Sequence, residues 1–299
     1  MKGGILMIIA QYTTNASGVR PRFDPNCVYA ANEVNNGDGT YTVILTADND
    51  FTYVDFCDQT SLLSVEYLKV TNKVTSTAEM FYNCDSLTSV NANGWDTSNV
   101  AEMWEMFCYC CSLEEIIGIE NWNTSSLEDT TYMFMCCESL ISLNLSGWDT
   151  SKVYLPDAMF SDCTYLEELD ISNWDLNNAD PDWLPYMFYI SEFDPENTDW
   201  YNPDFKPYLK IIKCNNADTI SLIAPYLPDR STCDETGVII TNATDVDASM
   251  LASKNWNVYR VEPGPRKLAS MTFNDGTSNK KKISSRYGSG YIIKIIFNK

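Results

Sequence analysis

The sequence predicts a β-rich, leucine-rich-repeat-like solenoid of about 26-residue coils, with a small N-terminal β element and irregular α/β coils at the C-terminus. Three observations predict this fold: two sequence blocks recur in register, a Leu-x-x-Leu-x-Leu pattern lies between them, and a hairpin signal precedes the first repeat. Self-similarity at a fixed period of this length is the signature of stacked repeats. One coil cannot bury its apolar face alone, so neighbouring coils must stack to form a shared core.

Residues 1–55 are predicted to form an N-terminal β cap. The apolar run Ile5–Ala10 predicts a first strand, and it is too short for the apolar core of a secretory signal. The turn Asn36–Gly39, followed by the alternating segment Tyr41–Thr46, predicts a hairpin. No stretch of the chain approaches the ~20 apolar residues that a spanning helix needs, so we expect no membrane insertion.

Residues 56–208 contain the predicted solenoid and its aromatic end region. The first block reads Met-Phe-x-x-Cys, and its phenylalanines fall 26, 27 and 26 residues apart. The second block reads Trp-Asp-Thr-Ser or a close variant, whose side-chain oxygens favour a turn. Between the blocks, apolar residues such as Leu143 and Leu145 alternate with polar ones, which predicts a short strand. The four copies begin at Met80, Met106, Met133 and Met159, and their tryptophans are Trp95, Trp122, Trp148 and Trp174.

Atypical coils are expected at both ends of the stack, because terminal repeats act as caps. Ser61–Val65 resembles Ser86–Val90 at a distance of 25 residues, which indicates a first coil that has lost its Met-Phe block. Met187 and Phe188 restart the pattern beyond the last full copy. Residues 209–262 are predicted to be irregular terminal coils, with strands at 209–214, 237–241 and 258–261 and helices at 217–226 and 247–254.

The sequence resembles a known family at these repeats. Met-Phe-x-x-Cys-x-Ser-Leu followed by Trp-Asp-Thr-Ser-Asn-Val, the latter at Trp95–Val100, is similar to the repeat of BspA-type leucine-rich-repeat surface proteins of gut and oral bacteria. The resemblance covers about residues 76–190 and extends weakly to residue 55. It implies adhesion to proteins or cells without catalysis. Members of that family are usually exported and anchored; this sequence shows neither signal, so we expect a different setting.

Charge is distributed unevenly along the chain. It holds 41 acidic and 20 basic residues, a net charge of −21, which disfavours nucleic acid as a partner. The last 40 residues instead carry +7, against −28 for the first 259. We therefore expect residues 263–299, which begin with the linker Pro263-Gly-Pro265, to be a basic assembly tail that docks on another copy, on another acidic protein or on nucleic acid. Its candidate residues are Lys280, Lys281, Lys282, Tyr291 and Phe297.

The residue types argue against an enzyme. There is no histidine, which removes the usual general base and the Ser-His and Cys-His nucleophiles. The acidic pairs Glu114-Glu115 and Glu167-Glu168 share a register two coils apart, on the order of 10 Å, and we expect them to form a solvated face. A carboxylate-based glycan-processing enzyme stays a distant alternative. We assign no catalytic residue, cofactor or metal ligand.

Two positions of the repeat carry the same residue type in every full copy, and each set of equivalent residues would form a column along the stack. Both columns have alternative interpretations. Cysteine at one position per coil favours core packing, although a disulfide or a metal site involving Cys108, Cys111 and Cys136 stays open. The tryptophan column favours packing between coils over stacking on sugars. The core cysteines would be Cys84, Cys110, Cys137 and Cys163.

The candidate binding surface lies at residues 181–208, which hold nine aromatic residues and five prolines. Clustered aromatic side chains favour burial against a partner, and capping of the solenoid's own end is the alternative. The candidates are Trp183, Tyr186, Tyr189, Trp200, Tyr201 and Tyr208.

Together these features predict a non-enzymatic protein for protein–protein binding and assembly. The first hypothesis is a structural or host-attachment component of a bacteriophage virion, made in the host cytoplasm. The alternative is a BspA-type adhesin on a bacterial cell surface. Expected partners are other virion or surface proteins, a second copy of the chain, and a host surface protein or glycan.

Overall fold

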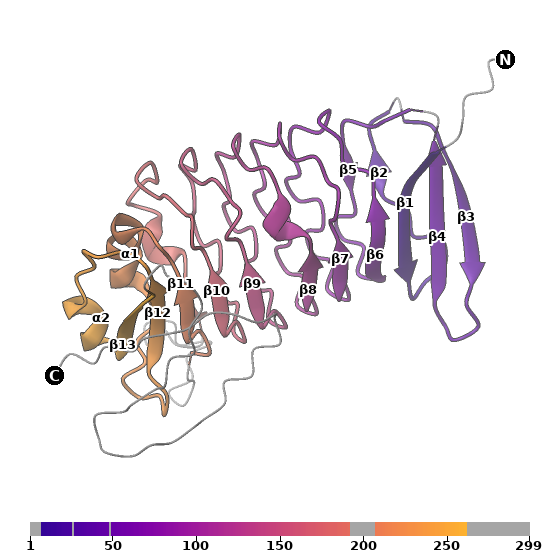
Figure 1. Cartoon of the computed structure of the whole chain (residues 1–299). Helices are drawn as coiled ribbons and strands as arrows, with labels where there is room; N and C mark the ends of the chain where they lie inside the picture. Colours follow the sequence, from indigo (N-terminus) through magenta and orange to yellow (C-terminus); the bar gives the residue numbers. More distant parts are fainter. Residues whose placement is uncertain (1–6, 26, 48, 192–206, 262–299) are drawn as a thin grey trace.

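The structure, a computed structural model, describes residues 7–25, 27–47, 49–191 and 207–261. This part of the chain is β-rich with few helices, and its strands other than β2 and β5 lie side by side in one long row (Figure 1). Two predicted features fall outside these residues. They are the assembly-tail residues Lys280, Lys281, Lys282, Tyr291 and Phe297, and the aromatic residues Trp200 and Tyr201.

The N-terminal part contributes antiparallel strands to a six-stranded sheet of order β3-β4-β1-β6-β7-β8. The predicted hairpin is present: β3 (Tyr29–Asn35) pairs antiparallel with β4 (Tyr41–Ala47). β1 (Met7–Thr14) lies between β4 and β6 (Leu62–Leu68) and is antiparallel to both. A separate two-stranded ribbon joins β2 (Arg22–Phe23) to β5 (Val54–Asp55).

Parallel pairing begins at β6 and follows the repeats. β6 pairs with β7 (Ser89–Asn91), which pairs with β8 (Glu115–Ile117). β9 (Ser142–Asn144) and β10 (Glu168–Asp170) open a second, five-stranded sheet of order β13-β12-β11-β10-β9. The central residue of each repeat strand is buried, and its neighbours point away from the core.

Aromatic side chains stack from coil to coil along this row. The rings of Phe107 and Phe134 have centroids 5.7 Å apart, and those of Phe134 and Phe160 are 5.8 Å apart, with nearly parallel planes. The four repeat tryptophans form a second buried column with centroid separations of 5.4, 5.9 and 6.4 Å. The tryptophan column is therefore internal, as the spacing predicted.

One correction concerns the first coil, which we expected to have lost its Met-Phe block. Phe56 occupies the phenylalanine position: its ring stacks on Phe81 at 5.5 Å, and its carbonyl accepts the Cys84 thiol proton at 3.1 Å. The coil lacks methionine, so the two-residue motif was not recognisable. The spacing of six residues from Phe56 to Leu62 equals that from Phe81 to Leu87, and this signal was available in the sequence.

The one 27-residue interval between phenylalanines contains an extra residue that changes the structure locally. The extra residue lies between Leu113 and Trp122, where Gly118 adopts φ +91° and precedes the 3-10 helix η1 (Ile119–Asn121). The Glu120 carbonyl approaches the next coil so closely that a Cβ at Gly147 would lie 1.9 Å from its oxygen. The ladder is interrupted here, and β8 and β9 belong to different sheets.

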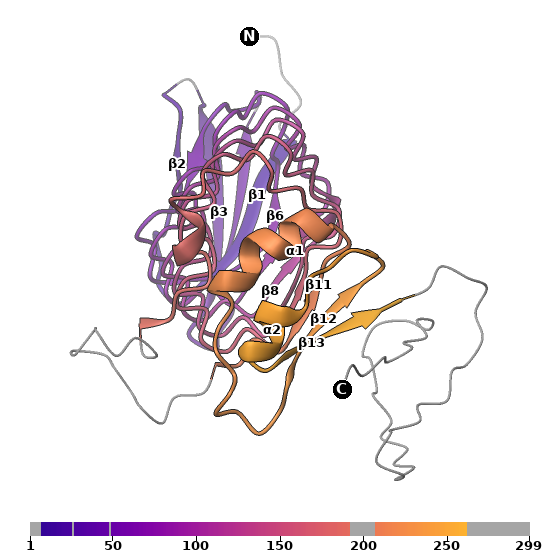
Figure 2. The same ribbon diagram turned by 90° about the vertical axis from the view of Figure 1, so that its left-hand side faces the viewer.

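The C-terminal coils alternate strands and helices, as predicted. β11 (Ile211–Lys213), β12 (Gly237–Thr241) and β13 (Trp256–Arg260) extend the parallel sheet. α1 (Ala217–Ile223) is capped at its N-terminus by Asn216, whose side chain accepts from two backbone amides, and it continues into the 3-10 helix η4 (Ala224–Tyr226). With α2 (Ser249–Ser253), α1 lies at the end of the row opposite β3 (Figure 2).

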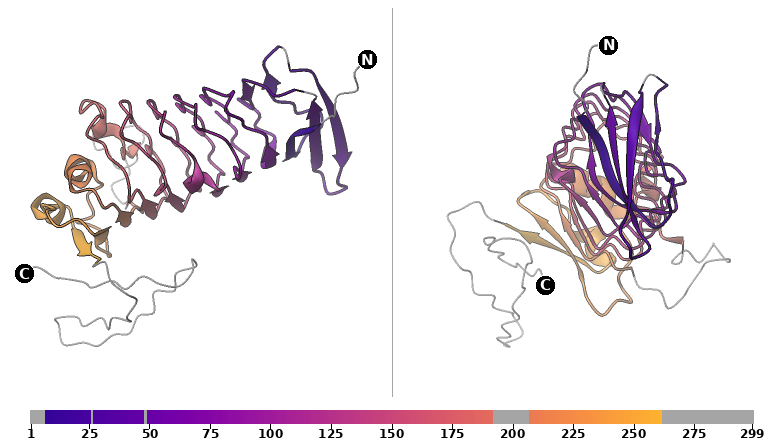
Figure 3. Two further views of the ribbon diagram at one scale, coloured as in Figure 1. Left: turned by 45° about the horizontal axis from the view of Figure 1, so that its top comes forward. Right: turned by 90° about the vertical axis from the view of Figure 1, so that its right-hand side faces the viewer.

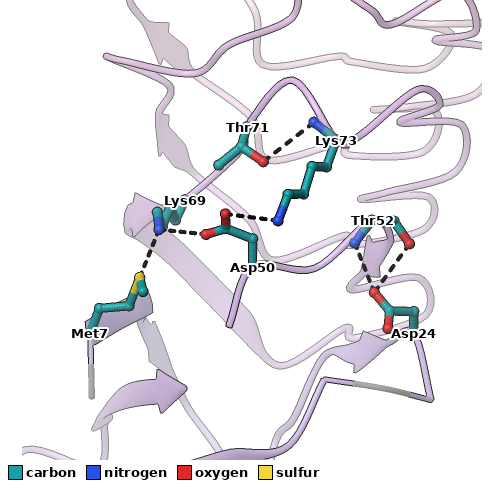
Figure 4. Close-up of polar contacts among 7 residues, drawn as sticks. All are labelled: Met7, Asp24, Asp50, Thr52, Lys69, Thr71 and Lys73. Atoms are coloured by element: carbon teal, nitrogen blue, oxygen red, sulfur yellow. Dashed lines mark hydrogen bonds and ion pairs between the residues drawn. The ribbon is translucent and has the colours of Figure 1, made fainter. Parts of the chain in front are cut away.

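A small polar network fixes the junction between the N-terminal sheet and the first coil (Figure 4). The Asp50 carboxylate accepts from Lys69 Nζ at 2.5 Å and lies 3.3 Å from Lys73 Nζ. Beside it, Asp24 accepts from the backbone nitrogen and the hydroxyl of Thr52. The hydrogen bond from Lys69 lowers the pKa of Asp50 below its ordinary value.

Asp50→Asn is expected to lower stability at pH 7 by up to about 1 kcal/mol, the range of partly exposed ion pairs. Because the folded-state pKa is lowered, the stabilisation is present above the unfolded pKa of about 3.9 and is lost as pH falls through the folded value. Urea unfolding of both proteins at pH 7 and near pH 2.5 measures this. An equal difference at both values would contradict the role of the charge.

Candidate binding surface

Two of the predicted aromatic residues lie at the 3-10 helix η2 (Leu184–Tyr186), between the last full repeat and the C-terminal coils. Trp183 precedes the helix and Tyr186 ends it; both are exposed, whereas Leu184 is buried in the core. Tyr189 is half-buried, and its carbonyl accepts from the Asp162 amide at 2.9 Å. Burial of Leu184 therefore anchors a short helix that presents Trp183 and Tyr186 to solvent.

Tyr208 belongs to a different place on the surface. Its exposed ring packs on the exposed ring of Tyr165, with centroids 4.9 Å apart. These two residues immediately precede Leu166 and Leu209, which are buried next to β10 and β11. Tyr165 was not among the predicted residues, although it replaces the serine that precedes the corresponding leucine in the other full copies.

Ion pairs cover the sheet surface that follows this tyrosine pair. Lys210 Nζ lies 3.0 Å from the Glu167 carboxylate, and Lys213 bridges Glu168 and Asp170. Burial of Lys213 by itself would lower its pKa. The pKa is nevertheless raised, because Glu168 and Asp170 stabilise the charged form of the side chain. Glu167 and Glu168, predicted on a solvated face, stay partly exposed, and each is paired with a lysine of the following strand.

A shallow, open depression lies on the flank of the stack. It is lined by Glu128, Ser151, Lys152, Tyr154 and Asn178. The exposed Tyr154 donates its hydroxyl proton to Asp180 Oδ2 at 2.8 Å, and this bond raises the pKa of Tyr154. The depression can accept a protruding side chain, but it does not enclose a ligand.

The cysteine column is part of the core. Cys84, Cys110, Cys137 and Cys163 are free and buried, and each thiol donates to the phenylalanine carbonyl of the preceding coil at 3.0–3.2 Å. Desolvation raises the pKa of all four thiols above the ordinary value. Cys108, Cys111 and Cys136 are also free, and the described residues contain no group of side chains suited to a metal ion.

Labelling with a thiol reagent at pH 8 is expected to miss these four cysteines in the native protein and to reach them after unfolding. Burial blocks the reagent, and the raised pKa suppresses the reactive thiolate. Half-buried Cys233 serves as the internal positive control. Mass spectrometry of the labelled peptides gives the result; rapid native labelling of the column would contradict the packing. Reductant should leave the melting temperature unchanged.

Comparison with known proteins gives one family match. Residues 109–208 match the family described as "Mycoplasma protein of unknown function, DUF285". This family is related to BspA-like repeat proteins, which agrees with the resemblance of the repeat motif. No curated protein and no solved structure matches the chain. In the described residues, every helix falls short of the length and apolarity that crossing a bilayer requires.

Proposed function

We propose that this chain is a non-enzymatic leucine-rich-repeat-like solenoid that binds other proteins and assembles with them. The observation that carries this proposal is the presence of two exposed aromatic groups, Trp183 with Tyr186 and Tyr165 with Tyr208, next to a core that is already filled. Tyrosine and tryptophan on a rigid support are the residue types that dominate protein interfaces. Their backbones are anchored by buried leucines, so little order would have to be gained on binding.

The chemistry of the remaining groups favours binding over turnover. The chain lacks histidine, the paired carboxylates Glu167 and Glu168 are bound by lysines, and burial raises the pKa of the column thiols. These features support a proposal without a catalytic residue, cofactor or metal.

Two biological settings follow from the proposal. The first is a structural or host-attachment component of a bacteriophage virion, in which the aromatic groups contact other virion proteins or a host surface protein or glycan. The second is an adhesin on a bacterial cell surface, and the specific observation that favours it is the match to a family related to BspA-like proteins.

The test measures binding of fluorescently labelled protein to bacterial cells and to printed protein and glycan arrays. Saturable binding is expected, and Trp183→Ala with Tyr186→Ala, or Tyr165→Ala with Tyr208→Ala, should reduce it strongly. Tyr67→Ala is the matched control, because Tyr67 is an exposed aromatic residue in β6, far from both groups. Binding that survives both double substitutions, or turnover of an array glycan, would contradict the proposal.

The predicted assembly tail has a separate expected result. A chain ending at Glu262 should stay folded but lose incorporation into a complex with acidic partners, because the removed segment carries a net charge of +7. Charge reversal at Lys280, Lys281 and Lys282 should weaken docking most at low salt, since screening acts over roughly 8 Å at physiological ionic strength. Sedimentation of the complex at two salt concentrations measures this, and unchanged incorporation would contradict an assembly role.

A further inference from the structure

The outermost strand of the N-terminal sheet, β3, has one edge that no other strand covers within the described part of the chain. On its other side β3 pairs with β4 over seven consecutive residues without a register shift. Figure 3 shows β3 at the end of the row, opposite α1 and α2. A regular edge of this length exposes a row of backbone N–H and C=O groups that can pair with another strand.

The side chains of β3 do not protect this edge. Proteins usually block a free edge with lysine, proline or a β-bulge. β3 reads Tyr-Ala-Ala-Asn-Glu-Val-Asn, and its single charged residue, Glu33, accepts from Gly18 N and Arg20 Nη1, both at 2.9 Å. Val34 is 50% exposed, and Val28, just before the strand, is 77% exposed. β3 therefore has no lysine, proline or unpaired carboxylate of its own, and its exposed side chains are small, amide or apolar.

The charge distribution indicates what can approach this edge. Residues 74–151 contain twelve acidic residues and no lysine or arginine, so two copies repel each other along the repeats. At β3 the one carboxylate is neutralised by Arg20. Two copies that meet end to end at β3 would hold their acidic repeats as far apart as the molecule allows.

We infer that β3 is the interface at which a second copy of this chain pairs, antiparallel, about a two-fold axis at Asn32. This inference is independent of the proposed function. A two-fold axis requires antiparallel pairing of a strand with itself. In the central register, Ala30 faces the partner's Val34, Ala31 faces the partner's Glu33, and Tyr29 faces the partner's Asn35. No charged side chain faces another, and the two six-stranded sheets become one continuous sheet.

The test is the molar mass of the full chain in solution, by light scattering after size exclusion. The unmodified chain should show twice its 33.9-kDa monomer mass. Ala30→Lys with Val34→Lys should yield the monomer, because each lysine faces a lysine of the second copy. Ala30→Lys with Val34→Glu should restore the dimer, because the same register then creates two lysine–glutamate pairs. Ile8→Lys is the matched control: Ile8 is exposed on β1, an interior strand, and the dimer should persist.

A second measurement does not depend on substitutions. Hydrogen exchange of the amides in Tyr29–Asn35 should slow as the protein concentration rises, whereas exchange in β13 should not change. Three results would each overturn the inference: a monomer at all concentrations, a dimer that survives the double lysine substitution, or a dimer that is lost only when the chain ends at Glu262. The last result would assign self-association to the tail instead.

Discussion

Replacing Phe134 and Leu140 together by alanine is expected to lower the free energy of unfolding by several kcal/mol, since each large-to-small core change costs about 2–5 kcal/mol. Both side chains are fully buried. The Phe134 ring stacks on its neighbours in both adjacent coils. Because this ring links the repeats on either side of it, the substitution should also weaken the coupling between those two parts of the chain. Guanidinium unfolding should then show a lower midpoint and a broader or biphasic transition.

Ile141→Ala is the matched control for this experiment. Ile141 follows Leu140 directly but is exposed, and surface substitutions usually change stability by less than about 0.5 kcal/mol. A loss below about 1 kcal/mol for the double core substitution would contradict the assignment of these two positions to the core, given the costs of core truncation.

Gly147→Ala is expected to destabilise the protein by about 1–3 kcal/mol, the usual cost of forcing extra volume into a packed region. The added Cβ would lie 1.9 Å from the Glu120 carbonyl oxygen, and backbone cannot move aside as a flexible side chain could. The effect is steric, since Gly147 does not have a positive φ. Relief would require η1 to shift, so the destabilisation should be accompanied by faster hydrogen exchange at Ile119–Asn121.

The equivalent position one coil later supplies the control. Asn173 precedes Trp174 as Gly147 precedes Trp148, and it already carries a Cβ. Asn173→Ala removes one exposed hydrogen bond, from Nδ2 to the Ser146 carbonyl at 2.6 Å, and should cost no more than about 1 kcal/mol. Equal melting temperatures for the two variants would show that the close approach of Glu120 does not constrain Gly147.

The periodic positions could be assigned from the sequence because equal spacing along the chain places equivalent side chains next to one another when repeats pack in register. The repeat phenylalanines and tryptophans stack on their counterparts about 26 residues away. This is why the buried columns of cysteine and tryptophan, and the strand at each Leu-x-x-Leu-x-Leu, were predictable. The hairpin of β3 and β4 was predictable for a local reason, its glycine-containing turn.

Features without a regular spacing needed the tertiary structure. Phe56 joins the phenylalanine column although its coil has no methionine, and stacking on Phe81 is what identifies it. Tyr165 and Tyr208 lie 43 residues apart, and only the parallel pairing of β10 with β11 brings their rings together. The candidate site therefore changed more than the fold did: one predicted cluster became two groups, and Tyr165 was added.

The sequence by itself predicted a β-rich chain with a period of about 26 residues, and it identified the recurring side chains that are buried. Only the tertiary structure decided where the stack is irregular and what its ends expose. The sequence shows only that the repeat containing Gly118 has one extra residue. The structure shows the consequence, which is the close approach of the Glu120 carbonyl to Gly147. Among the described residues, the free edge of β3 likewise follows from the strand order and not from the sequence of β3 itself. Packing decides which residues are neighbours in space. Spacing along the chain predicts those neighbours only where the repeat is strict.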